Sequence, residues 1–134
     1  MRFRSCLKPV CAALTALLLI SVSAHAAAAR PGQFFVYFGT FTGTNSKGIY
    51  VSRFDSATGK LSAPALAAQT VNPSFVAIAP DHHLLFAVNE TDEFHGQASG
   101  AVSAFKLDAS SGKLELLNQQ PSGGTGPCHV TVDP

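Results

Sequence analysis

The sequence predicts an all-β fold, namely part of a β-propeller preceded by a signal peptide. The segment GIYVSRFDSATGKL, beginning at Gly48, returns as GAVSAFKLDASSGKL, beginning at Gly100, and NPSFVAIAP, beginning at Asn72, returns as GPCHVTVDP. Gly59 recurs 53 residues later as Gly112. A period of this size with strand-like content is typical of stacked β units such as propeller blades. Runs such as FFVYF and FVAIA are apolar on both faces, as expected of a blade between neighbouring blades.

Short strands follow one another along the chain after the first 33 residues. β-branched and aromatic residues fill these runs, and turn-forming residues separate them. Two of the turns, DSATGK and DASSGK, begin with an Asp and carry a Gly that can adopt the positive φ needed to re-enter a strand. Both therefore predict hairpins. The expected strands are residues 34–41, 48–55, 61–70, 73–80, 84–90, 101–108, 114–120 and 128–134.

The repeat assigns each strand a place in a blade. The expected order, from the innermost strand outward, is 73–80, 84–90, 101–108 and 114–120. Residues 34–41 precede GIYV as LFAVNE precedes GAVSAF, so they take the second position in a blade with no innermost strand ahead of it. We therefore expect residues 34–134 to be the N-terminal part of a propeller domain, truncated at the C-terminus, whose later residues supply the missing strand. Alone, this part is expected to be inactive and partly ordered or aggregated, since each blade face needs a neighbour.

The first 26 residues have the pattern of a secretory signal peptide. Basic residues precede an apolar run at 10–22, and Ala24-His25-Ala26 offers small residues to a signal peptidase. The run is shorter than the about 20 residues that span a bilayer, and an uncleaved anchor is the alternative. Residues 27–33 are expected to be a tether. The mature protein is thus expected in the periplasm or outside the cell, free of the membrane.

Charge and cysteine content narrow the classes of partner. Cleavage would remove Arg2, Arg4 and Lys8 and leave six Lys and Arg against eight Asp and Glu, a net charge of −2. No cationic patch then favours binding to nucleic acid or to anionic lipid. Cys128 is the one cysteine of the mature chain, so no internal disulfide can form. A lone buried thiol is the simplest interpretation of Cys128; a reactive nucleophile, which needs a base or cation nearby, is the alternative.

Several motifs resemble the start of the bacterial lactonase family of seven-bladed propellers. In order, they are YFGTFTGTNSKGIYVSRFD, NPSFVAIAPD followed by LLFAVNE, and NQQPSGGTGPCHVTVDP. That family includes propeller-type 6-phosphogluconolactonases and is similar to fungal carboxymuconate-lactonising enzymes. The resemblance covers residues 34–134 and implies about two blades of seven. It implies hydrolysis of a sugar lactone, typically 6-phosphogluconolactone, at the mouth of the central channel. The export signal favours a different lactone, because phosphorylated sugars are scarce outside the cytoplasm.

His129 and Glu90 are the candidate catalytic residues. Lactone opening needs a water aimed at the carbonyl, a base that takes its proton, and donors for the oxyanion. His129 is expected to begin an innermost strand, where strand starts crowd the channel mouth, and it replaces Phe75 of the previous repeat. A structural His bonded to a neighbouring loop is the alternative. Glu90 ends a second strand, on the same face. By the resemblance, the catalytic His of the family falls in a similar motif beyond Pro134.

Other polar groups are expected to be structural or solvent-exposed. The loop at 89–100 holds three carboxylates and His95, which a divalent cation could use. Its spacing matches no known cation loop, so it predicts a solvated acidic loop without a metal. His82 and His83 fall in a tight turn on the face opposite the mouth. The GGTG segment at 123–126 is expected to be a crossing between blades, since no helix follows it to form a phosphate site.

The leading functional interpretation is an exported lactonase that acts on a small-molecule sugar lactone without a bound organic cofactor. Only Arg30 and Arg53 remain among the arginines of the mature sequence, so recognition of an anionic substrate group is expected to come from residues beyond Pro134. Two alternatives stay open: a non-catalytic propeller that binds a ligand or protein, and an activity of the carboxymuconate-lactonising type. Propellers host both catalysis and binding. The sequence does not indicate an oligomeric state.

Overall fold

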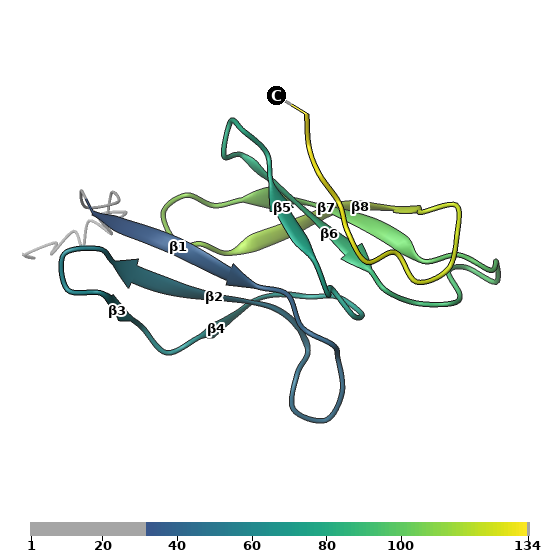
Figure 1. Cartoon of the computed structure of the whole chain (residues 1–134), viewed down its shortest axis with the longest axis horizontal. Helices are drawn as coiled ribbons and strands as arrows, with labels where there is room; N and C mark the ends of the chain where they lie inside the picture. The colour runs from purple at the N-terminus through teal and green to yellow at the C-terminus, as the bar shows by residue number, and fades with distance from the viewer. Residues whose placement is uncertain (1–31, 134) are drawn as a thin grey trace, which may run out of the picture.

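The structure, a computed structural model, describes residues 32–133, so the predicted signal peptide (1–26) and most of the tether (27–33) lie outside it. All regular secondary structure in this range is β (Figure 1), as the sequence predicts. No helix among these residues is long and apolar enough to cross a membrane. The first sheet contains β1 (Gln33–Phe38), β2 (Gly48–Asp55), β3 (Lys60–Leu61) and β4 (Ala65–Gln69). The second sheet contains β5 (Val76–Ile78), β6 (Leu84–Asn89), β7 (Ala101–Leu107) and β8 (Leu114–Pro121).

The second sheet has the strand order expected of a whole blade. Its four strands lie side by side in sequence order, and each neighbouring pair is antiparallel. In register across the sheet, Val76 lies opposite Ala87, Ala87 opposite Ser103, and Ser103 opposite Gln119. Residues 73–80 therefore supply the innermost strand of this blade, although the ladder itself covers only β5.

The first sheet is the same arrangement without an innermost strand. β1 pairs with β2 from Gln33 opposite Asp55 to Phe38 opposite Tyr50. β3 and β4 both pair with the other edge of β2. Within residues 32–133, no strand pairs with the free edge of β1. β1 therefore stands to β2 as β6 stands to β7.

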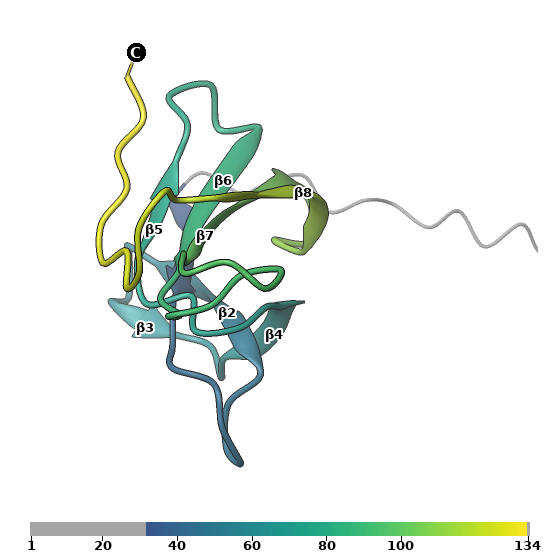
Figure 2. The same ribbon diagram turned by 90° about the vertical axis from the view of Figure 1, so that its right-hand side faces the viewer.

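Two of the expected strands differ from the structure. Residues 61–70, expected as one strand, divide into β3 and β4 around Pro64, which has no N–H to donate to a ladder. The strand expected at 128–134 is wrong for its described residues, because 128–133 form no ladder. A strand exists only with a partner, and no strand among the described residues pairs with this segment. The segment runs past β5 unpaired (Figure 1, Figure 2).

The two Asp-to-Gly turns form as the repeat predicts. The Asp108 carboxylate accepts hydrogen bonds from the N–H groups of Ser110 (2.8 Å) and Ser111 (3.3 Å), and Gly112 follows with φ of 76°. The hydrogen bond from the Ser110 hydroxyl, together with these backbone bonds, lowers the pKa of the Asp108 carboxyl to about 2. The same backbone bonds recur in the first turn, where the residues are Asp55, Ala57, Thr58 and Gly59.

The apolar core lies between the two sheets, which Figure 2 shows one above the other. It joins Ile49 and Val51 of β2 to Leu85 of β6 and Phe105 of β7, and all four are buried. Full burial of each such side chain stabilises the fold by about 1.5–3 kcal/mol. The face of the first sheet that points away from this core has no covering sheet in the described part of the chain. Phe34 on it is 57% exposed.

A buried polar network ties the two sheets together beside this core. Asn89, at the end of β6, donates to the hydroxyl of Thr70 (2.7 Å) and to the carbonyl of Val71 (2.5 Å), both in the crossing from the first sheet. The side-chain oxygen of Asn89 accepts from the hydroxyl of Ser103 (2.5 Å) and from the side-chain amide of Gln119 (3.3 Å). Asn89 therefore uses donors and acceptors on both sheets, and no buried side-chain polar atom among the described residues lacks a partner.

Replacement of Asn89 by Leu, which has a similar volume, should destabilise the full-length protein. The Asn89 side chain would no longer bond to Thr70, the Val71 carbonyl, Ser103 and Gln119, of which Ser103 and Gln119 keep their bond to each other, and the loss should cost roughly 3 kcal/mol in the free energy of unfolding. Urea unfolding followed by circular dichroism measures this change. The exposed Asn118→Leu variant on β8 is the matched control and should change the free energy by less than about 1 kcal/mol. Equal stability of Asn89→Leu and the parent would contradict the role of the network.

Candidate functional site

The loops of the two sheets gather at one end of the molecule, which we call the loop end. It comprises the β1–β2 loop (39–47), residues 72–75 ahead of β5, the β6–β7 loop (90–100) and the crossing at 122–127. The opposite end, called the turn end, holds the short hairpin turns that contain Asp55, His82 and Asp108. By the resemblance to propellers, the loop end is where the channel mouth is expected.

Glu90 lies at the loop end with its carboxylate held by a hydroxyl. The side chain of Ser74 donates a hydrogen bond to Oε2 of Glu90 at 2.5 Å. Ser74 precedes β5, and Glu90 follows β6, so the two residues meet because β5 and β6 are antiparallel neighbours. Both side chains are half-buried. The second carboxylate oxygen makes no hydrogen bond with any described residue.

Asn72 fixes the backbone around this pair. Its carbonyl accepts from the N–H groups of Glu90 (3.0 Å) and Ser74 (2.8 Å), and its side-chain amide donates to the Glu90 carbonyl (3.1 Å). The Asn72 side-chain oxygen also accepts from the N–H and the hydroxyl of Thr42, each at 2.9 Å. Asn72 has a φ of 42°, a left-handed conformation that Asn adopts more readily than most residues. It therefore links the β1–β2 loop to the start of β5 and the end of β6.

His129 lies at the same end, against the aromatic ring that it replaces in the repeat. The ring centroids of His129 and Phe75 are 4.5 Å apart, with an angle of 50° between the ring planes. His129 is exposed, and its ring makes no hydrogen bond with the described residues, so the alternative of a structural His bonded to a neighbouring loop finds no support there. No hydrogen bond joins His129 to Glu90. The two residues are linked indirectly: His129 packs against Phe75, and the preceding residue, Ser74, bonds to Glu90.

Close backbone packing brings the His129 segment to this place. Gly126 donates to the carbonyl of Thr91 at 3.0 Å, and Gly100 leaves room for the ring of Pro127, which a Cβ at position 100 would overlap. Gly126 has a φ of 60° and occupies the repeat position of Asn72. Asn72 and Gly126 are therefore both left-handed, and Phe75 and His129 lie three residues after them in contact with each other.

Sequence reasoning singles out Glu90 and His129 as candidates but does not indicate their neighbours Ser74 and Asn72. Serine and asparagine are common in loops, and neither residue is unusual in the segment NPSFVAIAP. The available signal was the repeat register. It places Ser74 just ahead of β5, next to the end of β6 that Glu90 follows.

The acidic loop that contains His95 is an ordered hairpin. Phe94 and Gln97 exchange backbone hydrogen bonds of 3.0 and 3.1 Å, and His95 and Gly96 between them have φ of 51° and 76°. This is the geometry of a two-residue hairpin turn. The three carboxylates of the loop do not converge. No group of three or more His, Cys, Asp or Glu side chains within residues 32–133 is arranged to hold a metal ion.

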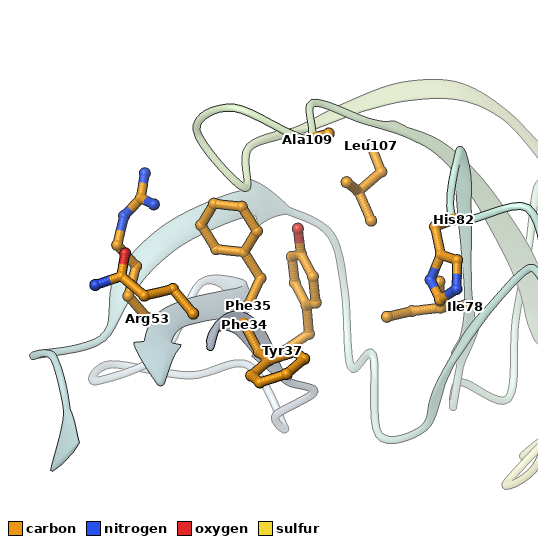
Figure 3. A pocket seen from close by; sticks show the side chains of 9 residues that line it. Phe34, Phe35, Tyr37, Arg53, Ile78, His82, Leu107 and Ala109 are labelled. Atoms are coloured by element: carbon orange, nitrogen blue, oxygen red, sulfur yellow. The ribbon is translucent and has the colours of Figure 1, made fainter. Parts of the chain in front are cut away.

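An apolar hollow lies away from these residues, toward the turn end. It has a volume of about 330 Å³ and separates Phe35 and Tyr37 of β1 from Ile78, His82 and Leu107 of the second sheet (Figure 3). His82 and His83 are exposed in their turn, as expected. His82 is the one of the two that lines the hollow.

Cationic side chains of the described residues are sparse at the loop end. Arg53 lies toward the turn end, with its guanidinium 4.6 Å from the ring centre of Phe35 and bonded to the carbonyl of Ser110 at 3.0 Å. Lys47 is the one Lys or Arg that the described residues place in a loop-end loop. The expected location of the anion-recognising groups, beyond residue 134, stays a prediction.

The interpretation of Cys128 as a buried thiol is wrong, because the structure places this residue in the open. Cys128 is an exposed free cysteine. It belongs to the segment 128–133, which pairs with no strand among the described residues. In the repeat it occupies the position of Ser74, which is half-buried.

Comparison with known proteins places this chain in a family. The model of the family described as "Lactonase, 7-bladed beta-propeller" matches residues 35–134. The chain is 40% identical over 101 residues to a 6-phosphogluconolactonase of Bacillus subtilis, covering 75% of this chain and 28% of that protein. The chain thus spans between a quarter and a third of the length of that curated relative.

Solved structures show the same fold. A structure from Bacteroides fragilis, named as a candidate 6-phosphogluconolactonase, has 37% identity and a TM-score of 0.68, covering 76% of this chain and 27% of the other. The structure of a periplasmic gluconolactonase of Pseudomonas aeruginosa has 35% identity and a TM-score of 0.63, covering 71% and 26%. The folded part of this chain therefore corresponds to about a quarter of each of these proteins.

Tyr37, which lines the hollow near the turn end, is expected to ionise at a higher pH than an ordinary tyrosine. Burial, and then the negative charge of Asp108, raise the pKa of the Tyr37 phenol from 10.0 to about 12. Because the folded-state pKa lies above the unfolded one, the stabilisation by the neutral phenol is complete below pH 10 and is lost as the pH rises to about 12. A rapid pH jump read by ultraviolet absorbance should show an ionisation step at about pH 12 that Tyr37→Phe removes. If Tyr37→Phe instead removes a step at about pH 10, the prediction is contradicted, whereas a step that remains in the variant belongs to another tyrosine such as Tyr50.

Proposed function

Because this chain belongs to the family of lactonases built on a seven-bladed β-propeller, we propose that the full-length protein hydrolyses a lactone to the open hydroxy acid. The observation that carries the proposal is the carboxylate of Glu90, held through one oxygen by Ser74 at the loop end. Its other oxygen is left for a water molecule. A half-buried carboxylate fixed in this way is suited to accept a proton from an attacking water.

The proposed reaction uses Glu90 as general base and then as general acid. Its carboxylate removes a proton from a water molecule while the water oxygen forms a bond to the lactone carbonyl carbon. The tetrahedral intermediate then collapses, and the bond between this carbon and the ring oxygen breaks. The departing ring oxygen takes the proton back from Glu90, so the carboxylate is regenerated and the product is a hydroxy acid.

His129 has a supporting role in this proposal. Its exposed ring, packed against Phe75, lines the mouth and can donate a hydrogen bond to the carbonyl oxygen, on which negative charge develops. By the resemblance to the family we expect a further catalytic His beyond Pro134, so His129 need not act as the base.

The proposed substrate is an unphosphorylated sugar lactone. The loop-end loops of the described chain carry the carboxylates of Glu90, Asp92 and Glu93 against the single cation of Lys47. A phosphate dianion would be repelled by this excess of negative charge unless later residues outweigh it. The likeness to a periplasmic gluconolactonase supports the same choice, whereas the relatives named 6-phosphogluconolactonase support the phosphorylated one.

We also propose that the protein is exported, with residues 1–26 as a cleaved signal peptide and residues 34–134 as the first part of the propeller. The support is the sequence pattern of the N-terminus, together with a similar protein described as periplasmic. An unphosphorylated sugar lactone is a substrate that such a compartment can contain.

We also propose that the propeller closes into a ring of blades through the free edge of β1. The Arg53 N–H donates to the Ser62 hydroxyl, and the Arg53 carbonyl accepts from the Ser62 N–H, so the backbone groups of Arg53 point away from β1. Phe35, opposite Arg53, is then in a non-bonded pair, and its N–H and C=O point to the free edge. A strand from later residues would pair there, as β5 pairs with β6, and would cover the hollow beside Tyr37.

Replacement of Glu90 tests the chemistry. In full-length protein, Glu90→Gln should lower kcat for lactone hydrolysis by roughly 100-fold or more, because the amide cannot accept the proton. Glu93→Gln is the matched control, since Glu93 is an exposed carboxylate in the same loop, and its kcat should stay within about threefold of the parent. Hydrolysis is measured by the acid released. Full activity of Glu90→Gln would remove Glu90 from the mechanism.

A substrate comparison tests the specificity. The value of kcat/KM for D-glucono-1,5-lactone should exceed that for its 6-phosphate by at least about tenfold. A preference for the 6-phosphate would overturn the proposed substrate and leave the proposed lactonase intact. Lactone binding without hydrolysis would favour a non-catalytic propeller, and conversion of carboxymuconate would favour the lactonising type.

A further inference from the structure

We propose that Ser74 is a positioning residue that orients the Glu90 carboxylate for catalysis. The inference rests on the proposed function, since it assigns to Ser74 an effect on a step that Glu90 performs. Ser74 itself does not touch the substrate in this proposal. Its hydrogen bond keeps one oxygen of the Glu90 carboxylate toward the protein and leaves the other oxygen facing the reacting water.

The contact between the two side chains is short and one-directional. The Ser74 hydroxyl can donate its single proton to Oε2 of Glu90 at 2.5 Å, and hydrogen bonds to ionised acceptors are the shorter and stronger kind. A Glu side chain has three rotatable bonds between its backbone and its carboxylate, so an unrestrained one samples several positions. One fixed oxygen reduces these positions and leaves the second oxygen in a defined place.

The backbone on both sides of this contact is fixed independently. Asn72 accepts from the N–H of Ser74 and of Glu90, and Pro73 between Asn72 and Ser74 is fully buried. The hydroxyl of Ser74 makes no hydrogen bond with described residues besides that to Glu90. Its loss should therefore leave the backbone of the loop end unchanged and release only the carboxylate.

The repeat shows that this arrangement is not a requirement of the fold. The position of Ser74 in the next copy is Cys128, and the position of Glu90 in the preceding copy is Thr40, whose hydroxyl donates to the Gly48 carbonyl at 2.6 Å. A blade can thus be built with other residues at both places. Thiols are weak donors, so Cys128 could not hold a carboxylate as Ser74 does.

A double-mutant cycle in the full-length protein tests the inference. Ser74→Ala should lower kcat for hydrolysis of D-glucono-1,5-lactone on the order of tenfold, with KM within about twofold of the parent. Ser74→Thr keeps the hydroxyl and should restore kcat to within about threefold. In the Glu90→Gln background, Ser74→Ala should cause no further loss, because the residue it positions no longer acts. Thr125→Ala, which removes an exposed hydroxyl from the same end, is the matched control.

The outcomes separate this inference from the proposed function. Full activity of Ser74→Ala, with Glu90→Gln still inactive, would overturn the role of Ser74 alone. Equal losses from Ser74→Ala in both backgrounds would show that Ser74 acts independently of Glu90 and would also overturn it. If Glu90→Gln is fully active, both the role of Glu90 and that of Ser74 fail. A lowered melting temperature of Ser74→Ala with no rescue by Ser74→Thr would assign the loss to folding and contradict positioning.

Discussion

The packing of one sheet against the next is the constraint on which the rest of this structure depends. A sheet whose strands are apolar on both faces has no stable position alone, so Val51 of β2 and Phe105 of β7 must be buried against each other's sheets. This burial is non-directional and does not by itself set how the sheets are aligned. Asn89 supplies the alignment, because its hydrogen bonds to Thr70 and Ser103 are satisfied in one relative position only.

The alignment of the sheets determines the geometry of the candidate site. Once the end of β6 is tied to the crossing at Thr70, Asn72 comes within reach of Glu90 and bridges it to the β1–β2 loop. Gly39 permits this approach, since a Cβ there would overlap the carbonyl of Pro73. The position of the Glu90 carboxylate is therefore a consequence of blade packing. It does not depend on an elaborate loop around the residue.

Much of the fold could be predicted from local sequence, and the errors have a common physical cause. Strand positions and the Asp108 turn follow from side chains within a few residues of one another, which a repeat makes visible twice. The pairing of 128–133 and the burial of Cys128 depend instead on what lies beside them in space. Likewise, Ser74 meets Glu90 across a sheet, with 15 residues between them in the chain, and its residue type gives no local signal. The candidate site is formed by contacts between strands. The sequence pattern of a single segment does not determine those contacts.

The repeat also explains how functional side chains can be introduced into such a scaffold at little cost to its stability. Positions equivalent by register reach the same end of the molecule in every blade, so a change of residue type there alters the mouth without altering the ladder. Phe75 and His129 illustrate this, because the two rings occupy equivalent positions and lie in contact. The residue after the second strand illustrates it again: Thr40 bonds to backbone in one blade, and Glu90 carries a carboxylate in the next. A channel mouth assembled in this way can change its polarity blade by blade while the interior between the blades stays the same.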